Sequence, residues 1–330
     1  MLLVRNIRLP LSCPDPDAEA AAQALRILHV PARKAAHCGV AKLSVDARHG
    51  KPVLVYTMAI TLKDEGEESA YAGASPCVCF TQPARFSFPV GDTALKSRPV
   101  VGGLGPAGLF AALLLARSGF RPLVLERGPE LDERVKAVEH FEKTGELNLN
   151  ANIQFGEGGA GTFSDGKLTT RVGDPLCAFV TDAFLQHGAP ADIAWRQKPH
   201  VGTDLLRGII RSIRQEIIAL GGEVRFHTAL TGLKIENGAL AGIETTAGDF
   251  ACQQLILAVG HSARDTFAML HSLGLPLECK PFSVGFRAEH LQTEIDKSLY
   301  HAAAGHPVLP VGEYQLSQHV SGGRCVYTFC

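Results

Sequence analysis

An excess of charge of one sign is absent from this sequence: 32 lysines and arginines nearly balance 33 acidic residues, and the formal net charge is −1. A chain that binds nucleic acid or an acidic membrane surface through its overall charge needs a clear basic surplus. Basic residues are also not interleaved with aromatic ones. We therefore predict that neither nucleic acid nor a membrane is a partner.

Signals for export and membrane insertion are also missing. Residues 1–10, MLLVRNIRLP, have no basic segment followed by an apolar core, so they do not read as a signal peptide. The uncharged run Val100–Ala116 is shorter than the ~20 residues that span a bilayer, and Pro106 and several glycines break its first half. The sequence thus predicts a cytoplasmic protein.

The sequence has nine cysteines, but their arrangement indicates no metal site. Cys77 and Cys79 form only C-x-C, and no second pair stands at zinc spacing. We expect reduced thiols, many of them buried, and predict no metal ligand. With 330 residues, 46% of them hydrophobic, the chain is long enough for two or three domains with substantial cores.

Residues 98–127 organise the rest of the chain, because they read strand, glycine turn, helix, strand and acid in that order. Gly103, Gly105 and Gly108 form G-x-G-x-x-G after the first strand. The first glycine permits a tight turn, the second lets a pyrophosphate approach the backbone, and the third lets the helix pack on the strand. Pro106 suits the first helical turn, whose free N–H groups favour phosphates.

The acid in this unit is Glu126, which follows the second strand, Leu123–Leu125. It lies 23 positions after Gly103 (126 − 103), close to the spacing of about 20 at which an acid meets the ribose hydroxyls. A lone glycine motif would be weak evidence. The ordered elements around it favour a dinucleotide site over an empty glycine turn.

A second glycine-rich stretch, residues 156–170, has five glycines in fifteen residues and cannot be a helix or an ordinary strand. Successive N–H groups in such a run can line an anion or a flat ring. Thr162, Ser164 and Lys167 would add side-chain donors. A flexible surface loop is the alternative, which the interspersed Phe155 and Phe163 disfavour.

The remaining chain predicts a mixed α/β protein. Residues 1–90 read strand, helix, strand, strand, the order of a small ferredoxin-like α+β domain, and a Pro-rich connector at 83–99 follows. Helices are expected at 132–143, 174–187 and 203–220. The last should bury Leu205, Ile209, Ile213 and Ile217, with Arg207, Arg211 and Arg214 on a solvated face.

Residues 223–251 predict a β-meander, with strands at 223–230, 233–236 and 239–244, a hairpin turn at Asn237-Gly238 and a further turn at Gly248-Asp249. The apolar run 255–259 predicts a central parallel strand whose end faces a ligand crevice. Residues 280–330 read as strand-like throughout, including 281–289 and 324–330.

These patterns resemble the FAD-binding fold of the glutathione-reductase type, a Rossmann fold with a β-meander that binds FAD or NAD(P). More narrowly, four motifs resemble a family of bacterial FAD-dependent dehydrogenases of uncharacterised substrate with a small N-terminal α+β domain. The motifs are V-L-E-R-G at 124–128, N-I-Q-F-G-E-G-G-A-G-T-F-S-D-G-K-L-T-T at 152–170, K-P-H-V-G-T-D at 198–204 and L-A-V-G-H-S-A-R-D-T at 257–266.

The resemblance implies a set of FAD-binding residues. It places the pyrophosphate at Gly103, Gly105, Pro106, Ala107 and Gly108. It places the adenosine at Glu126, Arg127 and the backbone of Leu230, with Gly260 closing the site. It places the flavin side along Gly158, Gly159, Gly161 and Thr162.

The resemblance also implies domains at 1–90, 97–270 and 271–330, the last being the incomplete start of a substrate or cap-type β domain. Gly102 and His301 depart from the family pattern, the latter standing where glycine is usual. Family members continue beyond residue 330 with a further strand–helix unit. We therefore expect a fragment of a longer flavoprotein, and residues 1–330 alone to bind FAD poorly or not at all.

The function predicted in this way is an FAD-dependent oxidoreductase, with FAD, an unknown small-molecule substrate and, as a candidate, NAD(P)H as partners. A dehydrogenase that uses NAD(P) alone and a non-catalytic nucleotide- or RNA-binding protein are the alternatives. Catalytic residues are not assigned. His261, directly after the predicted parallel strand, and Lys167 are the candidates for a chemical role.

Overall fold

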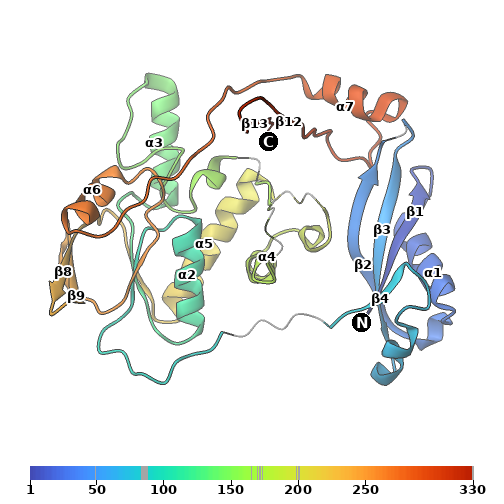
Figure 1. Cartoon of the computed structure of the whole chain (residues 1–330), viewed down its shortest axis with the longest axis horizontal. Helices are drawn as coiled ribbons and strands as arrows, with labels where there is room; N and C mark the ends of the chain where they lie inside the picture. The colour runs from blue at the N-terminus through green and yellow to red at the C-terminus, as the bar shows by residue number, and fades with distance from the viewer. Residues whose placement is uncertain are drawn as a thin grey trace. The chain divides into compact units, whose positions relative to one another are not determined.

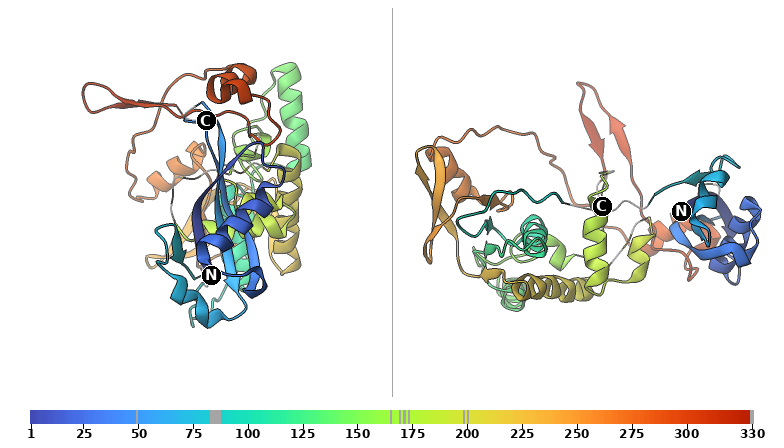
Figure 2. Two further views of the ribbon diagram at one scale, coloured as in Figure 1. Left: turned by 90° about the vertical axis from the view of Figure 1, so that its right-hand side faces the viewer. Right: turned by 90° about the horizontal axis from the view of Figure 1, so that it is seen from below.

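The computed structural model describes residues 1–48, 50–82, 88–164, 166–168, 170, 172, 174–197, 199 and 201–328. Residues 83–87 of the predicted connector, 329–330 of the predicted last strand, and positions 165, 169, 198 and 200 of the quoted motifs lie outside this description. The chain divides into two compact units, Met1–Ala84 with Trp195–Gln197 and Pro281–Cys330, and Arg85–Ala194 with Lys198–Lys280. Figures 1 and 2 show their elements.

The first unit contains a four-stranded antiparallel sheet in the order β2-β3-β1-β4. Its elements are β1 (Leu2–Pro10), α1 (Pro16–Leu28), β2 (Ala35–Asp46), β3 (Val53–Leu62) and β4 (Val78–Phe80). Alternate residues of β3 from Leu54 to Leu62 are buried in one core with Ala20, Ala24 and Leu28 of α1. The predicted strand–helix–strand–strand order is confirmed. A 3₁₀ segment, Glu65–Tyr71, stands where a complete ferredoxin-like unit has its second helix.

The prediction that residues 280–330 are strand-like throughout is wrong. The segment contains helix α7 (Gln292–Tyr300), a 3₁₀ turn (His301–Ala303) and a hairpin of β12 (Ser317–His319) and β13 (Cys325–Tyr327). In residues 281–289 apolar residues alternate, but this stretch forms no strand in the described structure, and Phe282, Val284 and Phe286 are exposed. Alternation produces a strand only where a neighbouring backbone satisfies the N–H and C=O groups.

The second unit is built on a parallel sheet in the order β11-β5-β6-β7, formed by β5 (Val100–Gly102), β6 (Leu123–Leu125), β7 (Glu223–Arg225) and β11 (Leu255–Leu257). Helices α2 (Pro106–Arg117), α4 (Cys177–Gln186) and α5 (Thr203–Ala219) supply the main core with it. In the described residues β11 lies at the edge, so its predicted central position is wrong. Ile256 and Leu257 are correspondingly exposed by 39% and 41%.

A separate three-stranded sheet, order β10-β9-β8, is formed by β8 (Leu230–Glu236), β9 (Ala239–Thr245) and β10 (Gly248–Ala251). The hairpin at Asn237 and Gly238 is confirmed, and both have positive φ, 50° and 77°. Two details were predicted wrongly. Residues 223–230 do not form one meander strand, because β7 pairs with β6 in the parallel sheet. Gly248 begins β10 instead of forming the turn before it.

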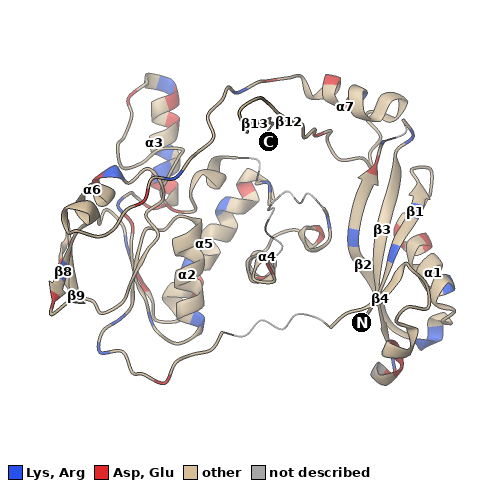
Figure 3. Cartoon of the chain, viewed as in Figure 1, with Lys and Arg blue, Asp and Glu red and all other residues tan. Residues whose placement is uncertain are grey.

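Two further helices, α3 (Leu131–Thr144) and α6 (Arg264–Ser272), complete the second unit. Basic and acidic residues are interspersed along the elements of both units, in keeping with the net charge near zero (Figure 3). In the part of the chain that the structure describes, no helix has the length and apolar character needed to cross a membrane.

Candidate cofactor site

A cavity of about 520 Å³ lies where β5, β6 and β11 end. The carboxyl ends of parallel strands share one edge of a sheet, which is where open α/β sheets bind ligands. The predicted residues that line it are Gly103, Gly105, Pro106, Ala107, Glu126, Arg127, Gly159, Leu230, Gly260 and His261. The others, Gly108, Gly158, Gly161, Thr162 and Lys167, are not among its lining residues.

The three glycines of the first motif have different surroundings. A Cβ at Gly103, whose φ is +103°, would collide with the carbonyl of Ala258, and one at Gly108 would collide with the carbonyl of Gly103. A Cβ at Gly105 would meet no atom within 4 Å. Two glycines therefore allow close backbone packing, whereas Gly105 keeps space open beside the N-terminus of α2.

Glu126 is 4% exposed, and both of its carboxylate oxygens accept backbone hydrogen bonds. Oε2 accepts from the N–H of Leu104 and Oε1 from the N–H of Gly128, both at 2.9 Å. The predicted ribose acid thus lines the cavity and also holds the glycine turn. The spacing rule located this residue but gave no sign of its second contact.

Arg127 lines the cavity and pairs with Asp265 at the start of α6, with 2.7 Å between Nη2 and Oδ2. Burial raises the pKa of the Asp265 carboxyl, but hydrogen bonds, chiefly from Arg127, outweigh it and hold that pKa below its usual range. The pair links the end of β6 to α6. The side chains of Arg127 and Asp265 are 25% and 64% exposed.

The second glycine-rich stretch provides another part of the cavity wall through Gly156, Gly159 and Ala160. Gly159 has φ +71°, and a Cβ there would lie 2.5 Å from Cδ of Pro106, so this loop packs against the start of α2. Thr162 is completely buried, and its hydroxyl donates to the carbonyl of Glu157 at 3.3 Å.

The two candidates for a chemical role are placed differently. His261 lines the cavity and is exposed, and its Nε2 lies 3.4 Å from Oγ of Ser262. Lys167 is half-buried and has interactions of its own. The described residues contain no group of three or more His, Cys, Asp and Glu side chains that could hold a metal ion.

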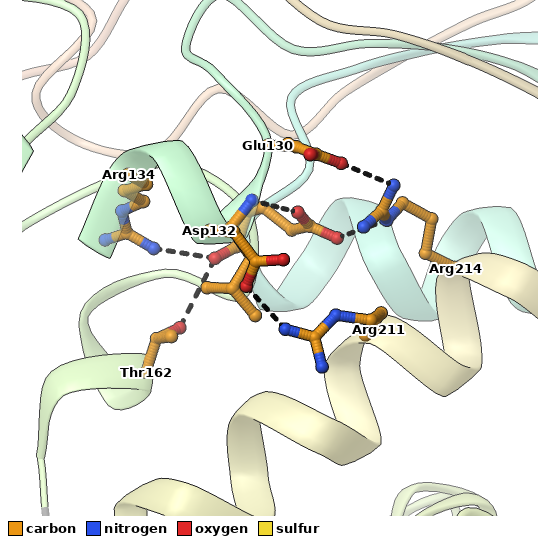
Figure 4. Close-up of polar contacts among 8 residues, drawn as sticks. Glu130, Asp132, Arg134, Thr162, Arg211 and Arg214 are labelled. Atoms are coloured by element: carbon orange, nitrogen blue, oxygen red, sulfur yellow. Dashed lines mark hydrogen bonds and ion pairs between the residues drawn. The ribbon is translucent and has the colours of Figure 1, made fainter. Parts of the chain in front are cut away.

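Sequence reasoning missed a polar cluster directly behind the glycine-rich loop (Figure 4). The arginines of α5 were predicted to form a solvated face, and this is wrong for Arg214, which pairs with Glu130 and the fully buried Glu157. Arg211 pairs with Asp132 at an exposed position, as predicted for a solvated face. The buried stripe also differs by one position, since Leu206 is buried and Leu205 is 51% exposed.

The buried acid of this cluster is Glu157, and burial raises the pKa of its carboxyl although Arg214 and the N–H of Leu131 act in the opposite direction. A glutamate between two glycines of the loop was the one available signal of this contact. No local pattern links Glu157 to an arginine 57 positions later (214 − 157).

Comparison with known proteins found a family-model match at the C-terminal residues. Residues 281–330 match the family model "FAD-dependent protein, C-terminal domain-like". This match supports FAD as the cofactor. A protein of Clostridium beijerinckii described as uncharacterized is 48% identical over 241 residues, which are 73% of this chain and 45% of that protein. The match therefore spans less than half the length of that relative.

Solved structures with some similarity include three proteins at low identity. They are Thermovibrio ammonificans THI4 (TM-score 0.36, 15% identity, 54% of this chain and 62% of that one), Bacillus cereus glycine oxidase (0.35, 12%, 55% and 60%) and Proteus myxofaciens L-amino acid deaminase (0.30, 16%, 60% and 51%). At TM-scores below 0.5 these similarities carry no argument for function.

Proposed function

We propose that this chain belongs to an FAD-dependent oxidoreductase whose nucleotide domain is of the glutathione-reductase type, and that the cavity beside Gly105 binds FAD. The observation that carries the proposal is the space left open at Gly105, between the start of α2 and the ends of β5 and β6. The family match at residues 281–330 names the same cofactor. FAD would supply the hydride chemistry, and the protein its binding and orientation.

The order of the residues around the cavity fits the order of the parts of an extended dinucleotide. The first turn of α2 offers unpaired N–H groups and a partial positive charge to the pyrophosphate beside Gly105. Glu126 would take the adjacent ribose, because each carboxylate oxygen retains an acceptor site after binding one N–H. Arg127 and Leu230 would then lie beside the adenine, and Gly156 and Gly159 would lie along the flavin half of FAD.

The substrate, the use of NAD(P)H and the catalytic residues are not assigned by this arrangement. His261 lies on the cavity wall and is the better placed of the two candidates. A side chain that moves a proton must be within hydrogen-bond reach of the reacting group. His261 is therefore the first residue to substitute once a substrate is known.

Equilibrium binding tests the proposal more directly than colour after purification, since weak binding is lost during purification. The chain is titrated with FAD, FMN and NAD⁺ by calorimetry, with ADP as competitor. We expect saturable binding of one FAD that ADP competes with, and weaker binding of FMN, which lacks the adenosine half. Binding of NAD⁺ tighter than FAD, or FAD binding that ADP does not compete with, would overturn the proposal.

A further inference from the structure

We propose that Arg134, Arg207 and Arg214, named here the arginine brace, are positioning residues that hold loop 152–163 in the shape that forms one wall of the cavity. The loop's part in binding FAD rests on the proposed function, whereas its shape does not. None of the three arginines lines the cavity, so the brace acts through the loop backbone.

Arg134, on α3, is completely buried and holds the first part of the loop. Its guanidinium donates to the carbonyls of Asn152 and Ile153, each at 3.1 Å, and of Glu157 at 2.6 Å. These carbonyls stand on both sides of residues 154–156, which line the cavity. One side chain therefore fixes the peptide groups at both ends of this wall segment.

The backbone of Gly156 packs closely against the side chain of Arg134. Its φ is +114°, and a Cβ there would lie 2.9 Å from Cδ and Nε of Arg134. The arginine thus occupies the space that a side chain at position 156 would need. This close approach gives a reason for glycine at 156 that is independent of any ligand.

Arg214 holds the middle of the loop through Glu157. Its Nε lies 2.8 Å from Oε1 of this buried carboxylate, whose other oxygen accepts from the N–H of Leu131 at 2.7 Å. Glu157 therefore ties the loop to α5 and to the start of α3 at once. Breaking such a pair leaves a buried charge without its partner, so an alternative loop position is strongly disfavoured.

Arg207 holds the end of the loop. Its Nε donates to the carbonyl of Thr162 at 3.3 Å, and its guanidinium lies 5.1 Å from the ring centre of Phe163. Arg134 lies 4.8 Å from the same ring. Two guanidinium groups therefore hold the ring of Phe163, at the end of loop 152–163, each within cation–π range.

The consequence is preorganisation. A run with glycines at 156, 158, 159 and 161 loses much conformational entropy when it is ordered, and a ligand that had to order it would bind more weakly. Burial lowers the pKa of Arg134 to about 10, so its guanidinium remains charged at neutral pH and keeps its donors. The brace orders the loop before a ligand arrives.

The test compares Arg134→Met and Arg134→Lys with Arg211→Gln. Arg211 belongs to the same cluster, but it pairs with Asp132 on α3 and not with the loop. Hydrogen exchange of amides 154–163 is measured without FAD, and the FAD dissociation constant by calorimetry. We expect Arg134→Met to speed loop exchange and weaken FAD roughly 10- to 100-fold, the size of losing hydrogen bonds from a charged group.

The control variants make the result specific. Arg134→Lys should recover part of both losses, since an ammonium can still donate to some of the carbonyls, and Arg211→Gln should change neither measurement by more than about twofold. Unchanged loop exchange in a folded Arg134→Met, or equal effects in Arg211→Gln, would overturn the inference. If Arg134→Met does not fold, Arg207→Gln is read by the same criteria at residues 160–163. If the unmodified chain binds NAD⁺ more tightly than FAD, the proposed function fails while loop exchange still decides the brace.

Discussion

The carboxylate of Glu126 accepts a 2.9 Å hydrogen bond from the backbone N–H of Leu104, so the acid that ends β6 holds the turn that follows β5. Leu104 stands between the first two glycines of the motif and is fully buried. The same carboxylate lines the cavity. One side chain therefore shapes the glycine turn and faces the place proposed for the ribose.

Replacing Glu126 separates these two roles. Glu126→Ala should weaken FAD by roughly 10- to 100-fold and lower the free energy of unfolding by about 1–3 kcal/mol, because it leaves two buried N–H groups unsatisfied. Glu126→Gln keeps one acceptor oxygen, so its FAD affinity and its stability should lie between those of Glu126→Ala and the unmodified chain. Calorimetric titration and urea unfolding measure the effects, with the exposed Glu139→Ala as control. Loss of FAD binding with no loss of stability would show that the contacts to Leu104 and Gly128 contribute little.

Gly105 and Gly108 offer a contrast within one motif. Gly105 has φ −66° and open space around a Cβ, so Gly105→Val should fold with a melting temperature near that of the unmodified chain and bind no FAD. Gly108→Val should fail to fold, because its Cβ would collide with the carbonyl of Gly103. Circular dichroism on heating shows whether each variant folds, and FAD titration shows whether folded Gly105→Val binds the cofactor. Stoichiometric FAD in folded Gly105→Val would place the cofactor elsewhere.

The elements best predicted from the sequence are those whose cause is local. Strand, glycine turn, helix and strand from Val100 to Leu125 were predicted closely, because each boundary is marked by glycine, proline or an apolar run within a few positions. The caps of α1 and α3 follow the same rule: Asp15 accepts from the N–H of Ala18, and Gly145 ends α3 with φ +79°.

Features that depend on distant partners were predicted poorly. Arg214 reads as a surface residue on its own helix, and only the fold brings it to Glu157. The apolar run at 255–257 is compatible with any position in a parallel sheet, and pairing with β5 alone puts it at the edge. The hydrophobic stripe of α5 was misassigned at Leu205 because both it and Leu206 fit a helical period within one residue.

The buried carboxyl of Glu157 should make stability depend on pH. Burial raises its pKa above the ordinary 4.5, so the folded chain holds this proton at pH values where the unfolded chain has lost it. The stabilisation from this group is therefore complete below about pH 4.5 and is lost as the pH rises through the raised value. Unfolding in urea is compared from about pH 4 to pH 8 for the unmodified chain and for Glu157→Gln, which cannot ionise.

We expect the stability of Glu157→Gln relative to the unmodified chain to rise with pH across this window. Glu139→Gln, at an exposed position on α3, is the control and should show no such trend. A relative stability that falls with pH would mean that Arg214 outweighs burial and that the folded pKa is lowered.

Thr266 provides a test of local energetics at the cavity that needs no ligand. Its side chain lies in the first turn of α6, is 2% exposed and lines the cavity, yet its Oγ1 has no hydrogen-bond partner among the described residues. A buried hydroxyl without a partner costs about 1–3 kcal/mol.

Valine has the same branched shape without the hydroxyl, so Thr266→Val should raise the free energy of unfolding by about 1 kcal/mol. Thr266→Ser, which keeps the hydroxyl and removes a buried methyl group, should lower it by about the same amount. Urea unfolding of both variants without FAD measures the two changes, and a Thr266→Val chain less stable than the unmodified one would show that the hydroxyl has a partner in solution.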